Sequence, residues 1–468
     1  MDNHKVKVLE QCKIGPPPGS VSSTSIPLTF FDIPWLCCPP IKRIFFYEFP
    51  YPTTHLLQKV LPNLKQSLSL TLKHFFPFSS NIVFPPKPQT PHILYKEGDT
   101  LPFIVAESTT NFNNLVSDTP RDVTCLHPFV PVLPSPRFLE EDQTLLISPM
   151  VVQVTIFPNS GFAICISLRH VVADGRAFHH FMKFWASLCG SKVGLDVPLH
   201  DRGMIQDPNG LRPIFLEAIW NIPIKTMEST GQVNNVPSDM VRRTFVLRSE
   251  HVENLKKYVS AKCKNNGLET LHVSTFVVTC SLIWVCKVKS EDSDKDDGVT
   301  LSNNDDELHI FAIMADSRNL PQFSIPLTYF GNCVVCGNAE VTRGKLVGQN
   351  GIFEAAIAIG SKIRCLKYEG YKGAETLMSN FTEFATLGKH MLLTAGSPKL
   401  DVYETDFGWG KPKMSEVVQV ESSMSISLSD CKDKGGIEVG IALGRTQMMK
   451  FNTLLEEFLA QIAVHHES

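Results

Sequence analysis

The sequence contains no apolar run long enough to cross a membrane. The most continuous run, from Phe276 to Val285, covers about ten residues, whereas a membrane-spanning helix needs about 20. The first residues, Met1 to Lys7, lack the apolar stretch of a secretory signal peptide. We therefore expect a cytoplasmic protein that has no membrane partner and whose 13 cysteines are reduced thiols.

Neither sign of charge is in large excess, since the formal net charge is only -3. Nucleic-acid binding requires a basic surplus, so we expect no nucleic-acid partner, and an anionic cofactor would need a local basic cluster. Hydrophobic residues make up 43% and charged residues 19% of the chain, which is typical of globular proteins. Single cores stop growing at roughly 250–300 residues, so a chain of 468 residues indicates two or three domains.

Two common hydrolase motifs are also missing from the sequence. It contains neither the H-E-x-x-H of zinc proteases nor the G-x-S-x-G of serine hydrolases. Cys333 and Cys336 have the spacing of half a zinc site, but no second pair of this kind exists. We interpret them as two buried strand cysteines and expect no metal site.

Strand and helix patterns alternate along the whole chain, which indicates an α/β fold. Residues 191–239 are rich in proline, glycine, asparagine and charge, as is typical of a crossover between domains. We therefore expect an N-terminal domain of residues 1–190, a linker of residues 191–239 and a C-terminal domain of residues 240–468. The main expected elements are helices at 61–76, 273–287 and 451–462, hairpins at 151–170 and 424–443, a strand at 309–314, and solvated acidic loops at 290–297 and 303–307.

His170 follows a strand pattern in which large apolar residues alternate from Phe162 to Leu168. It is in phase with these residues and therefore faces inward. Asp174 can cap the helix that follows, and Gly190 can end it. A histidine fixed at the end of a strand suits a general base. Two alternatives remain: a core histidine with no function, or a metal site of His170 and Asp174 that lacks a third ligand.

Of the 15 histidines, only His170 has an aspartate four residues later, in His170-Val-Val-Ala-Asp174-Gly175. Far downstream stands Asp406-Phe-Gly-Trp-Gly410. With these two motifs, and with Leu28-Thr-Phe-Phe-Asp32 and the segment 64–77, the chain resembles the BAHD acyltransferases over nearly its whole length. Tyr329-Phe-Gly-Asn-Cys333 resembles the subgroup that acylates sugars on anthocyanins and other flavonoid or phenolic glucosides, often with malonyl-CoA.

The resemblance implies two similar-sized domains of the chloramphenicol-acetyltransferase type with a channel between them. Acyl-CoA and the glucoside would meet at His170, which would take the proton of the acceptor hydroxyl and return one to the leaving thiolate. No covalent enzyme intermediate and no permanently bound cofactor would be needed, because both substrates are held together. We also expect a monomer.

The resemblance also assigns expected roles to individual residues. Asp174 would be structural and would pair with Arg318, and the loop that begins at Asp406 would be mostly structural as well. The indole N–H of Trp409 would either serve an oxyanion or simply pack.

The region expected to contact coenzyme A contains basic and hydroxyl residues. They are Lys256, Lys257, Ser274 and Thr275. The two lysines could equally form a solvated face of a helix.

Arg176 lies two residues after Asp174, where a helix is expected to start. A cation is mildly unfavourable there and needs a reason. Our hypothesis is that its guanidinium binds the free carboxylate of malonyl-CoA. The alternatives are an aromatic donor such as a hydroxycinnamoyl-CoA, a non-catalytic member of the fold, and a metal-dependent hydrolase.

Overall fold

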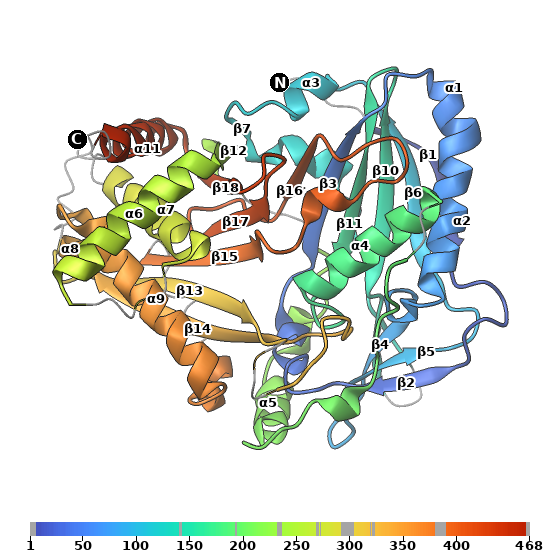
Figure 1. Ribbon diagram of the computed structural model, residues 1–468. Helices are drawn as coiled ribbons and strands as arrows, with labels where there is room; N and C mark the ends of the chain where they lie inside the picture. Colours follow the sequence, from blue (N-terminus) through green and yellow to red (C-terminus); the bar gives the residue numbers. More distant parts are fainter. Residues whose placement is uncertain are drawn as a thin grey trace.

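Three β-sheets and the helices packed on them make up the described part of the fold (Figure 1). The structure is a computed structural model. It describes residues 6–139, 143–191, 194–231, 236–267, 271, 273–291, 304–318, 320, 323–379 and 390–464.

The N-terminal sheet has six strands and carries the segment that leads to His170. In order across the sheet, its strands are β1 (Val6–Ile14), β6 (Leu101–Ser108), β10 (Met150–Phe157), β11 (Gly161–Leu168), β3 (Ile41–Glu48) and β16 (Met414–Val417). β10 and β11 pair antiparallel from Met150 opposite Leu168 to Phe157 opposite Gly161. The hairpin expected from the sequence is therefore confirmed.

In the middle of this sheet, β10 and β11 are buried on both faces, which the alternation in β11 does not predict. Phe162 and Ile164 pack into the main core, which also contains residues of α2 (Leu61–Leu72) and α4 (Gly175–Cys189). Ala163 and Cys165 point to the other face and pack into a second core beneath α3 (Phe112–Leu115). The alternation therefore separates large from small residues rather than buried from exposed ones.

The C-terminal sheet has seven strands and is covered by helices (Figure 1). In order, its strands are β14 (Val334–Thr342), β13 (Leu308–Asp316), β15 (Met391–Ser397), β17 (Ser425–Asp430), β18 (Ile437–Gly444), β12 (Met240–Leu247) and β7 (Arg121–Asp122). The helices are α6 (Ser249–Asn265), α7 (Thr275–Ser290), α8 (Arg343–Val347), α9 (Gly351–Glu369) and α11 (Arg445–Val464). The expected strand, second hairpin and closing helix in this half are confirmed.

A smaller sheet and several short helices complete the described elements. Its strands are β2 (Thr24–Pro27), β5 (His92–Tyr95), β4 (Asn81–Phe84), β9 (Leu145–Ile147) and β8 (Arg137–Phe138). The remaining helices are α1 (Thr53–His55) and α5 (Leu211–Trp220), and the helical turns are Ile33–Cys37, Leu56–Val60, Phe76–Ser79, Val123–Phe129, Arg202–Met204, Ile224–Thr226, Ala374–Thr376 and Val402–Glu404.

The two halves exchange strands, so the expected domain boundaries are not strict. β7 comes from the N-terminal half but pairs with β12, and β16 comes from the C-terminal half but pairs with β3. Glu416 of β16 accepts hydrogen bonds from Arg121 of β7 and Arg242 of β12, both at 2.8 Å. The expected linker contains α5. Of the two expected acidic loops, residues 292–297 and 303 lie outside the described residues.

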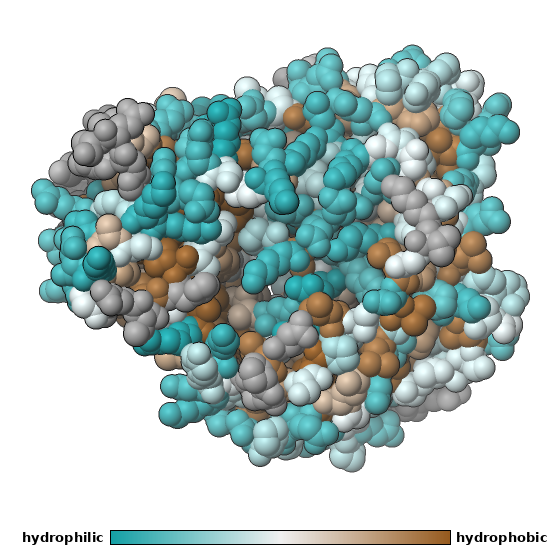
Figure 2. Space-filling view, viewed as in Figure 1, coloured by the Kyte–Doolittle hydropathy of each residue, from teal (hydrophilic) through white to brown (hydrophobic). Residues whose placement is uncertain are grey.

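Figure 2 shows this face of the molecule hollowed where the two halves meet, with hydrophobic and hydrophilic residues on its borders. Among the described helices, none is sufficiently long and apolar to span a membrane.

Candidate active site

His170 lies two residues beyond the end of β11, in the turn that leads into α4. Its imidazole stacks on the indole of Trp35 with ring centroids 3.8 Å apart and an interplanar angle of 17°. Trp35 belongs to the helical turn Ile33–Cys37 and is almost fully buried. The stack fixes the plane of the imidazole, as a proton-transferring group requires.

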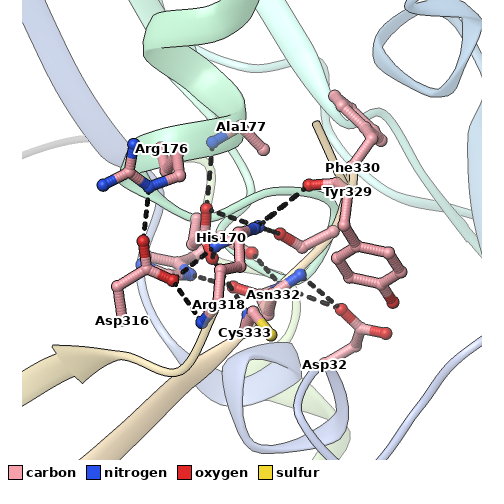
Figure 3. A network of polar contacts seen from close by, with 12 residues as sticks. Asp32, His170, Arg176, Ala177, Asp316, Arg318, Tyr329, Phe330, Asn332 and Cys333 are labelled. Carbon is pink, nitrogen blue, oxygen red and sulfur yellow. Dashed lines mark hydrogen bonds and ion pairs between the residues drawn. The ribbon is translucent and has the colours of Figure 1, made fainter. Parts of the chain in front are cut away.

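Asn332 fixes the tautomer of His170 (Figure 3). The amide nitrogen of Asn332 donates to three acceptors: Asp32 Oδ1 at 3.0 Å and the carbonyl oxygens of His170 at 2.9 Å and Val171 at 3.1 Å. The amide oxygen therefore faces His170 Nδ1, 2.9 Å away. Because an amide oxygen can only accept, Nδ1 must be the donor of this hydrogen bond. Nδ1 carries the hydrogen, and Nε2 keeps the lone pair that a general base uses.

The surroundings of His170 also favour the neutral imidazole. Burial lowers its pKa, and the negative charge of Asp174 and the hydrogen bond to Asn332 offset this effect only in part. A histidine with a lowered pKa is unprotonated at neutral pH and can accept a proton.

Asp174 is held by four donors and shapes the turn after His170. Its carboxylate caps α4 by accepting from the backbone N–H of Ala177 at 3.0 Å, and it accepts from the backbone N–H of Cys333 at 2.9 Å. Arg318 donates two further hydrogen bonds, at 2.7 and 3.2 Å. The expected pair of Asp174 and Arg318 is thus present, and the side chains of both partners are buried.

Arg318 joins this carboxylate to the segment that contains Asn332. Its terminal Nη2 donates to the carbonyl oxygens of Tyr329 and Gly331, both at 3.0 Å. Burial alone would lower the pKa of Arg318, but the carboxylates of Asp174 and Asp316 outweigh it and raise the pKa. Gly331 has φ +148°, and a Cβ there would lie 1.9 Å from Nη1 of Arg202, so only glycine fits.

Arg176 makes an ion pair that explains a cation at the start of α4. Its Nε donates to Asp316 Oδ2, and Asp316 Oδ1 accepts from Nη1 of Arg318 at 3.0 Å. Asp174, Arg318, Asp316 and Arg176 therefore form a chain of alternating charges, the charge ladder, which links α4 to the end of β13. Figure 3 shows the part from Arg318 through Asp316 to Arg176.

Trp409 lies far from His170, so the expectation that its N–H serves an oxyanion is wrong. Its ring packs 5.4 Å from that of Phe162 and 5.6 Å from that of Phe407. Phe162 is at the opposite end of β11 from His170, because it lies six strand positions, or about 20 Å, before Leu168. Packing accounts for Trp409.

The loop that contains Trp409 is placed at the far end of α4 as well. It packs against Gly190, where a Cβ would lie 3.3 Å from the Gly408 nitrogen. α4 has 15 residues and a length of about 22 Å, and its other end follows His170. Asp406 Oδ1 accepts from the N–H groups of Gly408 at 2.9 Å and Gly410 at 3.0 Å, so Asp406 shapes the loop and takes no part at the His170 site.

The four residues expected to contact coenzyme A lie on two neighbouring helices of the C-terminal half. Lys256 and Lys257 are in α6, where Lys256 donates to Glu253 at 2.8 Å. Ser274 caps α7 and Thr275 is its first residue. No hydrogen bond joins the four to one another in the described part of the chain, and their contact with coenzyme A stays a prediction.

Sequence reasoning missed three residues of the site: Asp32, Trp35 and Asn332. Asp32 is fully buried and receives two hydrogen bonds from Asn332, through its backbone and side-chain N–H groups, each at 3.0 Å. Both residues stand in segments that carried the resemblance, 28–32 and 329–333, but nothing in the sequence shows that these segments meet at His170.

The comparisons with known proteins agree with this geometry. A sequence model described as "Transferase family" matches residues 4–458. The chain is 38% identical to coumaroyl-CoA:anthocyanidin 3-O-glucoside-6''-O-coumaroyltransferase 1 of Arabidopsis thaliana, with 98% of each chain covered. It is 37% identical to malonyl-coenzyme:anthocyanin 5-O-glucoside-6'''-O-malonyltransferase of Salvia splendens, with 97% of this chain and 95% of that protein covered.

The crystal structure of vinorine synthase has the same fold, with a TM-score of 0.67 at 18% identity over 95% of this chain and 96% of that one. The expected α/β fold of two acyltransferase domains is thereby confirmed. The match over nearly the full length shows that this chain belongs to the transferase family of BAHD acyl-CoA-dependent acyltransferases.

Proposed function

We propose that this protein transfers the malonyl group of malonyl-CoA to a sugar hydroxyl of a phenolic or flavonoid glucoside, with His170 as the general base. The observation that carries the proposal is the hydrogen bond from His170 Nδ1 to Asn332 Oδ1, which leaves Nε2 as the acceptor. The relatives at 37–38% identity act on anthocyanin or anthocyanidin glucosides, which supports a glucoside acceptor.

In the proposed reaction, Nε2 of His170 takes the proton of the sugar hydroxyl while the oxygen attacks the thioester carbonyl. The tetrahedral intermediate collapses, the C–S bond breaks, and the imidazolium gives its proton to the leaving thiolate. Asn332 accepts a hydrogen bond from Nδ1–H throughout, and its amide nitrogen donates a hydrogen bond to the carboxylate of Asp32. The negative charge of Asp32 thus supports the transient imidazolium through Asn332.

Turnover of the His170→Ala variant tests the base. We expect the rate of acyl transfer to fall by roughly 10²–10⁴-fold while coenzyme A binding changes little. The matched control is His180→Ala, which removes a histidine of α4 whose ring contacts the Asp196 carbonyl. Substantial turnover in a folded His170→Ala protein would refute the mechanism. No turnover by the wild type with any acyl-CoA and glucoside would favour a non-catalytic member of the fold, and loss of turnover on chelation would favour metal chemistry.

The malonyl donor is proposed because of Arg176. Its contacts within the described residues use Nε, so its two terminal nitrogens can bind a carboxylate with two parallel hydrogen bonds. Such a contact contributes about 1.5–3 kcal/mol, which corresponds to a preference on the order of 10–150-fold over acetyl-CoA.

An aromatic acyl donor is the second candidate, because Asp316 already neutralises Arg176 and gives it a structural role. The relative at 38% identity is a coumaroyltransferase. A competition assay with equal malonyl-CoA, acetyl-CoA and coumaroyl-CoA separates the two. If Arg176 binds the carboxylate, Arg176→Ala loses malonyl transfer and keeps acetyl transfer. Lys183→Ala, which removes another cation of α4, keeps both. Equal product ratios in wild type and Arg176→Ala would exclude this role.

A further inference from the structure

Two histidines and a glutamate converge at the edge of the C-terminal half, away from His170. They are Glu307, His309 and His390, and the ligand atom that each offers lies within 4.8 Å of the others. β13 and β15 run parallel with Ile310 opposite Met391, so His309 of β13 is a neighbour of His390, the residue just before β15. Glu307 lies two residues before His309, the spacing that places side chains on one face of an extended chain.

The distances within this cluster fit a metal better than a hydrogen bond. Oε2 of Glu307 lies 3.6 Å from Nε2 of His309 and 3.4 Å from Nδ1 of His390. Charge-assisted hydrogen bonds of this kind measure about 2.7–2.9 Å. Zinc holds nitrogen and oxygen ligands at about 2.0–2.2 Å, so neighbouring ligand atoms in a tetrahedron lie about 3.3–3.6 Å apart.

We propose that Glu307, His309 and His390 bind one divalent transition-metal ion, with Zn²⁺ as the expected species. Two imidazoles and a carboxylate are a ligand set that zinc prefers, and a water molecule would complete the tetrahedron. The side chain of His309 is 1% exposed, whereas those of Glu307 and His390 are 37% and 23% exposed. The ion can therefore enter from the Glu307 side and be held against a buried imidazole.

The ion would stabilise the fold and would take no part in acyl transfer. Asp316 of the charge ladder lies seven positions after His309 along β13, a distance of about 23 Å. The site would join the starts of β13 and β15, two strands that are about 80 residues apart in the sequence.

Metal binding is tested on the full-length protein after treatment with a chelator and removal of that chelator. Titration with Zn²⁺ in a calorimeter is expected to show one ion per chain, and Co²⁺ is expected to give the visible absorption of a tetrahedral site. Affinity should fall at pH 5.5, because the imidazoles must be unprotonated to bind. Zn²⁺ should raise the thermal midpoint, since an ion that binds only the folded state stabilises it.

The variants for this test are Glu307→Gln and His390→Ala, because both residues are partly exposed and should fold without the side chain. Each is expected to lower Zn²⁺ affinity by about 10-fold or more. The matched control is Glu340→Gln on β14, which pairs with Ile310 and so lies on the opposite face of the sheet from His309. Wild-type protein that binds no Zn²⁺, or variants that bind it as tightly as the control does, would overturn the proposal. Acyl transfer should be the same with and without the ion, so failure of this site would leave the proposed enzyme activity intact.

Discussion

Replacing Asn332 with alanine tests whether the hydrogen bond at Nδ1 prepares His170 for catalysis. The substitution removes the side-chain acceptor at Nδ1, and it also removes the amide donor to Asp32 Oδ1. The stack on Trp35 remains, so the ring keeps its plane but loses the Asn332 acceptor that favours a hydrogen on Nδ1. Part of the population would then carry its hydrogen on Nε2, where it cannot accept a proton.

The expected loss of activity follows from the cost of leaving a buried polar group without a partner. That cost is about 1–3 kcal/mol, which corresponds to a decrease in kcat of roughly 5–150-fold. The pH dependence should shift as well. The hydrogen bond to Asn332 raises the pKa of His170, so its removal lowers that pKa, and the acid limb of the kcat/KM profile should move to lower pH.

Kinetics of Asn332→Ala should be measured from pH 5 to pH 9 and compared with those of Thr29→Val. Thr29 donates its hydroxyl to Asp32 Oδ2 at 2.7 Å, so this control weakens the support of Asp32 without touching the imidazole. We expect Thr29→Val to keep the wild-type position of the acid limb. A folded Asn332→Ala protein with the wild-type kcat and an unmoved acid limb would refute the assigned tautomer.

Three further substitutions test other parts of the structure. Asp174→Asn leaves the buried Arg318 without its main partner and should lower the free energy of unfolding by about 3–5 kcal/mol, as measured by denaturant titration; lost activity with unchanged stability would instead indicate a direct catalytic role. Trp409→Phe should leave kcat within about twofold of wild type, because the ring lies far from His170, and a large drop in kcat with normal folding would contradict its placement. Burial raises the pKa of Glu438 from 4.5 to about 7, so the stability linked to its protonation is present below pH 4.5 and is lost as the pH rises through 7. Glu438→Gln should therefore gain up to about 3 kcal/mol of stability relative to wild type at pH 8.5 but little at pH 5, and equal pH profiles would show that this carboxyl is not perturbed.

Local patterns in the sequence predicted the elements that carry His170. The hairpin of β10 and β11, the cap at Asp174 and the end of α4 at Gly190 all depend on residues close together in the chain. Periodicity and capping preferences are properties of short segments, so the sequence is sufficient for them. The pairing of Asp174 with Arg318 spans 144 residues and was expected only through the family resemblance.

Positions that depend on distant segments could not be predicted in this way. Trp409 shares a motif with Asp406, and a motif gives residue types without a distance to His170. Only the packing of its ring on Phe162 shows that it lies at the far end of β11. Conversely, Asn332 reaches His170 across 162 residues of sequence, and no local pattern marks an asparagine whose amide is fixed by three acceptors.

For Arg176, the local sequence argument identified a cation that needs a partner but could not identify that partner. A cation at the start of a helix is unfavourable, and this was the reason to assign it a ligand. The structure supplies Asp316, 140 residues away, as a partner within the protein. Because Asp316 also holds Arg318, which holds Asp174, the helix that follows His170 is tied to the C-terminal half by the charge ladder. Asn332 comes from the same half, so the orientation of the turn and the tautomer of His170 both depend on the contact between the two halves. A change that loosens this contact should therefore reduce catalysis even where every residue around the imidazole is intact.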